Sequence, residues 1–386
     1  MLSCLFLLLA ASLLFITQNS QIESVAPAAL SDPVANEPVV PNEPNVPAEP
    51  EAQTKSASSS NPVVAPAPVA KKPEPIKLER IFYMSQLRRK EGIESLKKNA
   101  NKIDVIAPQF YAVTDKLELA GGLDDELKQI ISQKNLKVMP LVANQDFEQS
   151  TIHNLLVSEK AQDFIVKGLV HLAEKNNYIG WQFDFENISY LDRDLYSAFV
   201  EKTAEALHEK GLILSVAAVS RSVDYEDTNA FKNWSGVFDY ERLAKAVDFI
   251  SIMTYDDPNS VGPVASLPFV NSVLNYLKDK IPPQKLSLGI PLYYWGWQAE
   301  PLKRITASGT YRRLSGIMED FTCSYGFDES LGNSWVAYFW EDNQYVLWVQ
   351  DKKTFENRLD IVKQNNLLGF SAWVLGIEDP AIWSAL

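Results

Sequence analysis

The stretch that decides the fold is GWQFDFEN, residues 180–187, near the middle of the 386-residue chain. Its polar and aromatic residues alternate one by one, and a β-strand points successive side chains to opposite faces. The polar face holds Gln182, Asp184 and Glu186, and the aromatic face holds Trp181, Phe183 and Phe185. Three polar groups on the inner face of a strand suit the lumen of a barrel only if they are hydrogen-bonded or used for chemistry.

Short runs rich in β-branched and aromatic residues flank this stretch on both sides, separated by segments with apolar residues at three- and four-residue spacing. This alternation is typical of repeated strand–helix units, and eight of them close into a barrel. The predicted fold is therefore α/β, a (β/α)8 TIM barrel. The candidate strands are Arg80 to Ser85, Ile103 to Val113, Lys137 to Ala143, Gly180 to Glu186, Ile213 to Val219, Asp248 to Tyr255, Lys285 to Leu292, and Gly369 to Leu375.

The segment from Trp295 to Gln350 is too long for one loop and contains the strand-like pieces SWVAYFW and YVLWVQ. We predict a small α+β insertion between strands seven and eight. A doubly wound open sheet is the competing architecture, but it lacks the glycine-rich first turn that a nucleotide site would need.

The N-terminal fifth of the chain has a different composition. Residues 2–16 form a predominantly apolar run, which predicts that residues 1–24 are a signal peptide or an N-terminal membrane anchor. Residues 25–76 contain twelve of the 22 prolines and no aromatic residue, so we expect a disordered Pro/Ala-rich linker. Residues 77–386 remain as the catalytic barrel, and the protein is expected to be exported, to the periplasm, the cell envelope or the medium.

Composition excludes several classes of function. The formal net charge is −13, and no basic patch interleaved with aromatic residues counters it, so nucleic acid is not an expected partner. The three histidines, His153, His171 and His208, are too few for a zinc site or a Ser/His/Asp triad. We predict no metal and no cofactor. Cys323 is expected to be a buried or partly buried small residue.

Asp184 and Glu186 are the candidate catalytic pair. Two carboxyl groups this close, in a poorly hydrated site, raise the pKa of one, which then acts as an acid while the other holds a charge. Active sites of barrels lie at the C-terminal ends of strands, where these residues stand. The spacing alone leaves two alternatives open: acids that are merely solvated, and acids that bind a metal.

Four motifs together resemble glycoside hydrolase family 18. GxQxDxE at Gly180 to Glu186 is similar to the family's strand-four signature DGxDxDxE. It is accompanied, in the expected order, by MTYD at Met253 to Asp256, by GIPLY at Gly289 to Tyr293, and by the closing GFSAWVLGIEDPAIW. The resemblance covers the whole domain after the linker and is greatest to the branch of spore-cortex and cell-wall N-acetylglucosaminidases.

The resemblance implies retaining, substrate-assisted cleavage of β-1,4 bonds next to N-acetylglucosamine, in which the acetamido oxygen of the sugar is the nucleophile. It makes Glu186 the proton donor and Asp184 the group that orients the acetamido group. Tyr255 would donate to the acetamido oxygen, Asp256 would bind the sugar next to the scissile bond, and Trp373 would form the floor of the reactive subsite. Without the motif, core packing is the ordinary explanation for Tyr255 and Trp373.

The chain departs from the signature at two positions, where Ile179 and Gln182 replace acids. Gln182 is expected to hydrogen-bond Asp184, without sharing a proton with it, and to belong to the substrate-binding set. Tyr293 and Trp297, which follow the strand-seven motif, are the further candidate sugar contacts. The expected partner is a polysaccharide containing N-acetylglucosamine, peptidoglycan or chitin, and the alternative function is an inactive, lectin-like barrel that binds carbohydrate.

Overall fold

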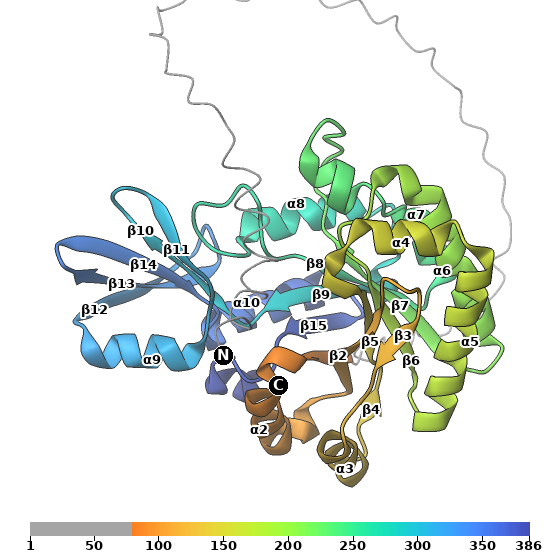
Figure 1. Cartoon of the computed structure of the whole chain (residues 1–386). Helices are drawn as coiled ribbons and strands as arrows, with labels where there is room; N and C mark the ends of the chain where they lie inside the picture. Colours follow the sequence, from red (N-terminus) through yellow and green to blue (C-terminus); the bar gives the residue numbers. More distant parts are fainter. Residues whose placement is uncertain (1–78) are drawn as a thin grey trace, which may run out of the picture. The chain divides into compact units, whose positions relative to one another are not determined.

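The computed structural model describes residues 79–386, so the predicted export segment and linker, residues 1–76, lie outside the described residues. Eight parallel strands of this range form a closed barrel, in which β1 pairs with both β2 and β15 (Figure 1). The (β/α)8 prediction is confirmed. The barrel strands are β1 (Glu79–Ser85), β2 (Val105–Val113), β5 (Leu141–Asn144), β6 (Gly180–Asp184), β7 (Ile213–Val219), β8 (Phe249–Met253), β9 (Leu286–Pro291) and β15 (Gly369–Trp373).

The third barrel strand is interrupted, whereas the sequence predicted one strand from Lys137 to Ala143. Its first part, β4 (Lys137–Val138), pairs with β2, and β5 resumes pairing after Pro140. Proline has no backbone N–H and cannot donate to the ladder. Its carbonyl still accepts a hydrogen bond from the backbone N–H of Gln182 at 3.0 Å, which ties the interruption to β6. A short antiparallel strand, β3 (Leu119–Gly121), pairs with the end of β2.

Strand β6 ends at Asp184, two residues earlier than predicted. The backbone N–H of Glu186 donates to the side-chain oxygen of Asn144 at the end of β5 and not to a backbone carbonyl of the sheet, and Asn187 adopts a left-handed conformation with φ of 54°. The chain therefore leaves the sheet at Glu186, which carries the second carboxyl group.

The helices other than α9, which belongs to the insertion, surround the barrel on its outside (Figure 1). Several begin at a side chain that accepts a backbone N–H of the first turn, as Asp124, Ser158 and Ser266 do. Within residues 79–386, no helix has the length and apolarity to cross a membrane. The α-helices are α2 (Arg89–Asn99), α3 (Asp125–Lys134), α4 (Gln149–Leu156), α5 (Glu159–Asn176), α6 (Arg193–His208), α7 (Tyr240–Ala246), α8 (Leu267–Leu277), α9 (Tyr311–Asp320) and α10 (Lys352–Gln364).

The aromatic face of β6 packs outward against the helices, as its alternation predicted. The ring of Phe183 stacks on Phe185 at 4.8 Å and on Phe199 of α6 at 5.5 Å. The indole N–H of Trp181 donates to the carbonyl of Leu169 in α5 at 2.9 Å. These contacts fix the roll of β6, so that its polar face must look into the lumen.

The predicted α+β insertion lies between β9 and β15 and extends to one side of the barrel (Figure 1). Its antiparallel sheet has the order β11-β10-β14-β13-β12 and packs against α9 around Tyr294, Leu314 and Leu347. The strands of the insertion are β10 (Tyr294–Gln298), β11 (Lys303–Gly309), β12 (Cys323–Asp328), β13 (Asn333–Trp340) and β14 (Asn343–Val349).

We expect Phe183→Ala to lower the free energy of unfolding by about 3–5 kcal/mol, because it removes a fully buried ring from the stack that sets the roll of β6. Phe164→Ala, which changes a ring that is 61% exposed on α5, is the matched control and should change stability by less than about 0.5 kcal/mol. Chemical denaturation followed by circular dichroism measures both. Equal effects of the two substitutions would contradict this packing.

Candidate active site

The barrel gathers the predicted catalytic residues at one end. Asp184 and Glu186 lie at the C-terminal end of β6, and Tyr255 and Asp256 follow the end of β8. The charges of Asp184 and Asp256 both act on the carboxyl group of Glu186, and all three acids act on the hydroxyl of Tyr255. Residues 70 positions apart in sequence therefore share one electrostatic environment.

Glu186 is positioned through its backbone by Asn144, a buried residue at the end of β5. The Asn144 side-chain oxygen accepts the backbone N–H of Glu186 at 3.0 Å, and its amide donates to the Glu186 carbonyl at 2.9 Å. Burial, and then the nearby charges of Asp184 and Asp256, raise the pKa of Glu186 well above its usual range. The raised pKa favours the protonated carboxyl group, which is the form that a general acid needs.

Asp184 is buried, with 4% exposure, and burial raises its pKa to about 6. The side-chain amide of Gln109, on β2, donates to Asp184 Oδ2 at 2.8 Å and lowers that pKa, because it favours the charged form. The sequence analysis did not identify Gln109. The one available signal was a polar residue in the otherwise apolar run VIAPQFYAV.

Gln182 does not hydrogen-bond Asp184, and this expectation was wrong. Its amide N–H₂ donates instead to Ser215 Oγ at 2.7 Å and Ser251 Oγ at 3.0 Å, and its side-chain oxygen has no partner among the described residues. Its side chain is also fully buried, which corrects its assignment as a substrate-binding residue. A glutamine amide can bridge two hydroxyl groups across a packed barrel, whereas Asp184 lies nearer the open end.

A chain of buried serine hydroxyls continues this polar layer across the barrel. Ser251 bonds Ser371 at 2.8 Å, and Ser371 bonds Ser287 at 2.7 Å. The hydroxyl of the buried Tyr83 in β1 lies near Ser251, Ser371 and Gln182. The network forms a rigid polar floor beneath the two carboxyl groups.

Tyr255 and Asp256 are held by strand β9. A side chain at Gly289 would lie 2.9 Å from Cε1 of the Tyr255 ring and 2.5 Å from the Ile252 carbonyl, so the glycine of the GIPLY motif makes room for the MTYD motif. The hydroxyl of Tyr293 donates to Asp256 Oδ1 at 2.6 Å. Tyr293, 5% exposed and occupied by this bond, orients Asp256 and offers little surface to a sugar.

Asp256 is solvent-exposed as a residue, but protein surrounds its carboxyl group closely enough to raise the pKa to about 6. The hydrogen bond from Tyr293 and the positive charge of Arg304 lower that pKa. Asp256 also has a left-handed backbone, with φ of 55°, an uncommon conformation for a residue other than glycine that often marks functional sites.

Trp373 and Trp297 are the two partly exposed indoles of the predicted set. Trp373 ends β15, with its ring 5.5 Å from the ring of Tyr83. Trp297 belongs to β10 of the insertion, and its indole N–H donates to the carbonyl of Gly262 in the β8–α8 connection at 2.8 Å. The partial exposure of both rings is compatible with stacking against a sugar.

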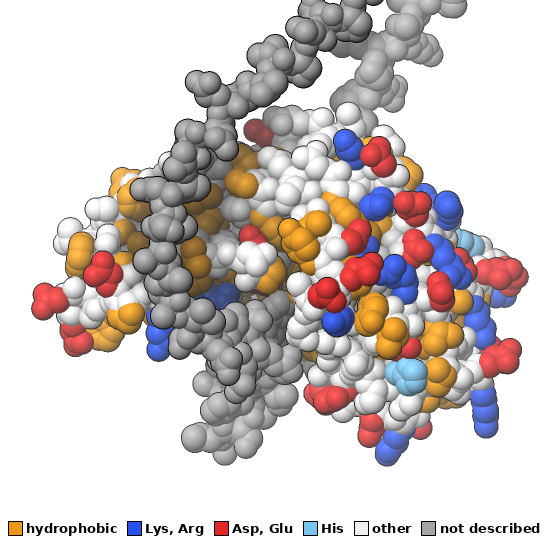
Figure 2. All heavy atoms as spheres, turned by 90° about the horizontal axis from the view of Figure 1, so that it is seen from above, with side chains coloured by type: hydrophobic (Ala, Val, Ile, Leu, Met, Phe, Trp, Pro, Cys, Tyr) orange, Lys and Arg blue, Asp and Glu red, His pale blue; other side chains and the backbone are white. Residues whose placement is uncertain are grey.

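The described residues contain no group of three or more His, Cys, Asp or Glu side chains arranged to hold a metal ion. Cys323 is a free, partly buried cysteine. Figure 2 shows acidic and basic side chains interspersed over the helical half of one face, while hydrophobic side chains gather over the insertion. The exposed apolar residues of the insertion include Leu302, Ile305, Tyr325, Phe339 and Trp340.

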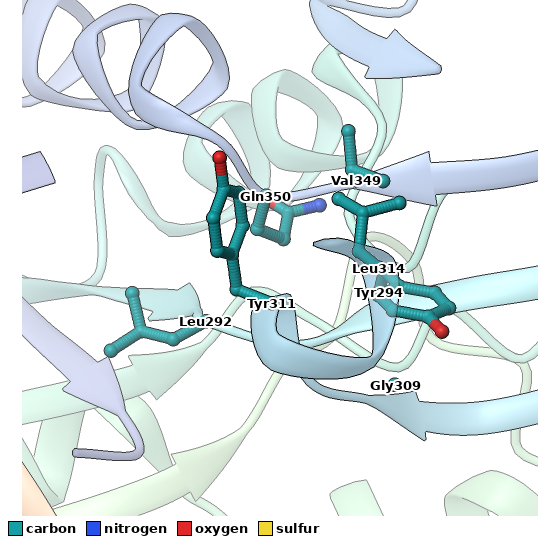
Figure 3. Close-up of a pocket in the computed structure, with 7 residues that line it drawn as sticks. All are labelled: Leu292, Tyr294, Gly309, Tyr311, Leu314, Val349 and Gln350. Carbon is teal, nitrogen blue, oxygen red and sulfur yellow. The ribbon is translucent and has the colours of Figure 1, made fainter. Parts of the chain in front are cut away.

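A small cavity of about 10 Å³ lies within the insertion, near its junction with the barrel (Figure 3). Two buried side chains of its lining lack hydrogen-bond partners among the described residues. They are the amide of Gln350, at both its nitrogen and its oxygen, and the hydroxyl of Tyr294. A space of this size could hold at most about one water molecule. It is too small for a sugar and is not the active site. Its lining is Leu292, Tyr294, Gly309, Tyr311, Leu314, Val349 and Gln350.

A closed parallel barrel with carboxyl groups gathered at its strand ends is the arrangement of a barrel enzyme. The family described as glycosyl hydrolases family 18 matches residues 79–378, and the chain belongs to this family. It is therefore a glycoside hydrolase that acts on a glycan.

Among curated relatives, the glycosylase YvbX of Bacillus subtilis is 26% identical over 301 residues, which are 76% of this chain and 86% of YvbX. The cortical fragment-lytic enzyme of the same organism is 26% identical over 273 residues, which are 67% of this chain. The match spans only 62% of that enzyme's length.

Two solved structures share the fold. The spore cortex-lytic enzyme SleL of Bacillus megaterium has a TM-score of 0.71 and 22% identity, with 81% of this chain and 74% of that chain covered. A chitinase from Chromobacterium violaceum has a TM-score of 0.70 and 24% identity, with 80% of this chain and 98% of that chain covered.

We expect Asp184→Asn to stabilise the fold at alkaline pH. The raised pKa of Asp184 contributes stability that is present below pH 3.8 and is lost as the pH rises through about 6, because the folded protein must then hold a buried charge. Removing this charge should increase the free energy of unfolding by about 1–3 kcal/mol at pH 8 and change it little at pH 4.

Asp124→Asn is the control of opposite sign. Its pKa is lowered to about 2, chiefly by Arg89, so the charged form stabilises the fold at pH 8. Urea denaturation at the two pH values should show Asp184→Asn gaining stability relative to the unsubstituted chain as the pH rises. Asp124→Asn should be less stable than the unsubstituted chain at both values, because a carboxyl group with a pKa of about 2 is already ionised at pH 4. If both substitutions lowered the stability at pH 8, the ionised form of Asp184 would not destabilise the fold.

Proposed function

We propose that the chain hydrolyses β-1,4 bonds next to N-acetylglucosamine in peptidoglycan, by a retaining, substrate-assisted mechanism. The observation that carries the proposal is the pair of carboxyl groups at the end of β6, of which Asp184 is buried and Glu186 is partly exposed but closely surrounded by protein. Their pKa values are both raised, and that of Glu186 is raised further by its two acidic neighbours. This environment separates a proton donor from a charge-holding partner.

In the first step, Glu186 gives its proton to the glycosidic oxygen while the acetamido oxygen of the same sugar attacks the anomeric carbon. The bond to the leaving sugar breaks and an oxazolinium ion forms. Asp184 as a carboxylate stabilises the positive charge of this ion, and Gln109 keeps its ionised form accessible. The hydroxyl of Tyr255 donates to the acetamido group.

In the second step, Glu186, now a carboxylate, takes a proton from water as the water adds to the anomeric carbon. The oxazolinium opens to the acetamido group, and the sugar leaves with its original configuration. Asp256 binds the sugar next to the scissile bond, oriented by Tyr293, and Trp373 forms the floor of the reactive subsite.

The likeness to a cortical fragment-lytic enzyme supports peptidoglycan as the polymer, and chitin is the alternative. A barrel that binds carbohydrate without cleaving it is the second candidate function. The raised pKa of Glu186 favours hydrolysis as the function, because binding of a carbohydrate without cleavage does not require a carboxyl group in a destabilising environment.

Replacing Glu186 with Gln removes the transferable proton but keeps the size of the side chain. We expect it to lower the release of reducing N-acetyl sugars from purified peptidoglycan by about 10²–10⁴-fold, since that is the usual contribution of a general acid. Reducing-end assays on peptidoglycan and on chitin oligomers, run side by side, measure the loss and identify the preferred polymer.

Glu159→Gln, an exposed change at the start of α5, is the matched control and should retain full activity. Sugar release that survives Glu186→Gln would remove Glu186 from the mechanism. Binding of glycan by the unsubstituted chain without any release would establish the lectin-like function in its place.

A further inference from the structure

We propose that Arg304 binds a carboxylate of the substrate, so that the cleft selects a glycan whose sugar near the scissile bond carries an acidic ether group, as N-acetylmuramic acid does, over a neutral polymer of N-acetylglucosamine. The inference rests on the proposed function of the same site and names the feature that separates its two candidate polymers.

Arg304 comes from the insertion but reaches the acids of the barrel. It lies on β11 opposite Trp297 of β10. Its guanidinium carbon stands 4.2 Å from the ring centroid of Trp295 and 5.8 Å from that of Trp297. Its positive charge acts on Asp256 and on Tyr293, and these two in turn act on Arg304. Two indoles thus hold the guanidinium beside the subsite of Asp256.

The hydrogen-bonding groups of Arg304 are not used within the described part of the chain. Arg304 is partly buried there, yet no hydrogen bond and no ion pair within 4.0 Å satisfies its guanidinium. Other buried arginines of the same chain behave differently. Arg358 donates to the carbonyl of Gly332 at 3.2 Å, and Arg221 donates to the carbonyl of Ser235 at 3.2 Å. Arg304 therefore has five donors aimed at no protein acceptor.

The negative charge of the site indicates what Arg304 would contribute to the binding of substrate. Asp184, Glu186 and Asp256 share one environment, and no lysine or arginine of residues 79–386 forms an ion pair with any of them. An acidic sugar would be repelled by these groups unless a cation lay at its carboxylate. The planar guanidinium matches a carboxylate with two parallel hydrogen bonds, whereas a neutral polymer gains nothing from the charge.

The test is binding to the Glu186→Gln chain, in which hydrolysis is suppressed. The probe is a peptidoglycan glycan strand freed of its peptides by an amidase, which leaves the lactyl carboxylate of each muramic acid. The same strand with that carboxylate converted to an amide is the neutral partner. Isothermal calorimetry at low ionic strength gives the dissociation constant of each form.

We expect the acid form to bind about tenfold more tightly than the amide form, since hydrogen bonds between charged groups are among the stronger ones. Adding Arg304→Gln should make the two affinities equal. Lys303→Gln, which removes the same charge from the opposite face of β11, is the matched control and should leave the tenfold preference intact.

Arg304→Lys keeps the positive charge but cannot form two parallel hydrogen bonds with a carboxylate, so it should retain part of the preference for the acid form. It provides a second measurement if Arg304→Gln does not fold. The inference is overturned if the acid and amide forms bind equally to the Glu186→Gln chain, or if Arg304→Gln weakens both forms by the same factor. Absence of sugar release by the unsubstituted chain would instead overturn the proposed function, and the binding preference would still be measured.

Discussion

Two carboxyl groups, those of Asp184 and Glu186, are held close together in a poorly hydrated site at the end of β6, and the surrounding structure maintains this arrangement. The aromatic stack of Phe183 with its neighbours fixes the roll of the strand. Asn144 turns the backbone at Glu186, and Gln109 keeps Asp184 ionisable. Placing two acids close together with little solvent around them destabilises their charged forms, and the proposed proton donor depends on this effect.

The insertion supplies an aromatic and a basic side chain to the site. The barrel strands supply acids and a polar floor of serine hydroxyls, whereas β10 and β11 supply Trp297 and Arg304, whose charge acts on Asp256. The hydrogen bond from Trp297 to Gly262 ties the insertion to the β8–α8 connection. The proposed substrate-selecting residue thus lies in the insertion, and the proposed catalytic acids lie in the barrel. The two parts can vary independently on a common fold.

The barrel and its order of strands could be predicted because periodicity and alternation are local properties of the sequence. The pair Asp184 and Glu186 could be located for the same reason. Gln109 and Asn144 could not be found, because their roles arise from contacts across 75 and 42 positions of sequence. The prediction for Gln182 failed because alternation assigns a residue to a face but not to a depth, and Gln182 lies a full layer below the acids.

The account depends on the acetamido group of the substrate acting as the nucleophile, with Asp184 beside it and Glu186 serving first as acid and then as base. The anomeric configuration of the first product tests this most directly, and it can be followed by proton NMR during the first minutes of hydrolysis of an N-acetylglucosamine oligomer or peptidoglycan fragment. The account predicts that the new reducing end appears as the β-anomer and only later equilibrates with the α-anomer. First appearance of the α-anomer would contradict it, because direct attack by water inverts the configuration and needs no oxazolinium ion.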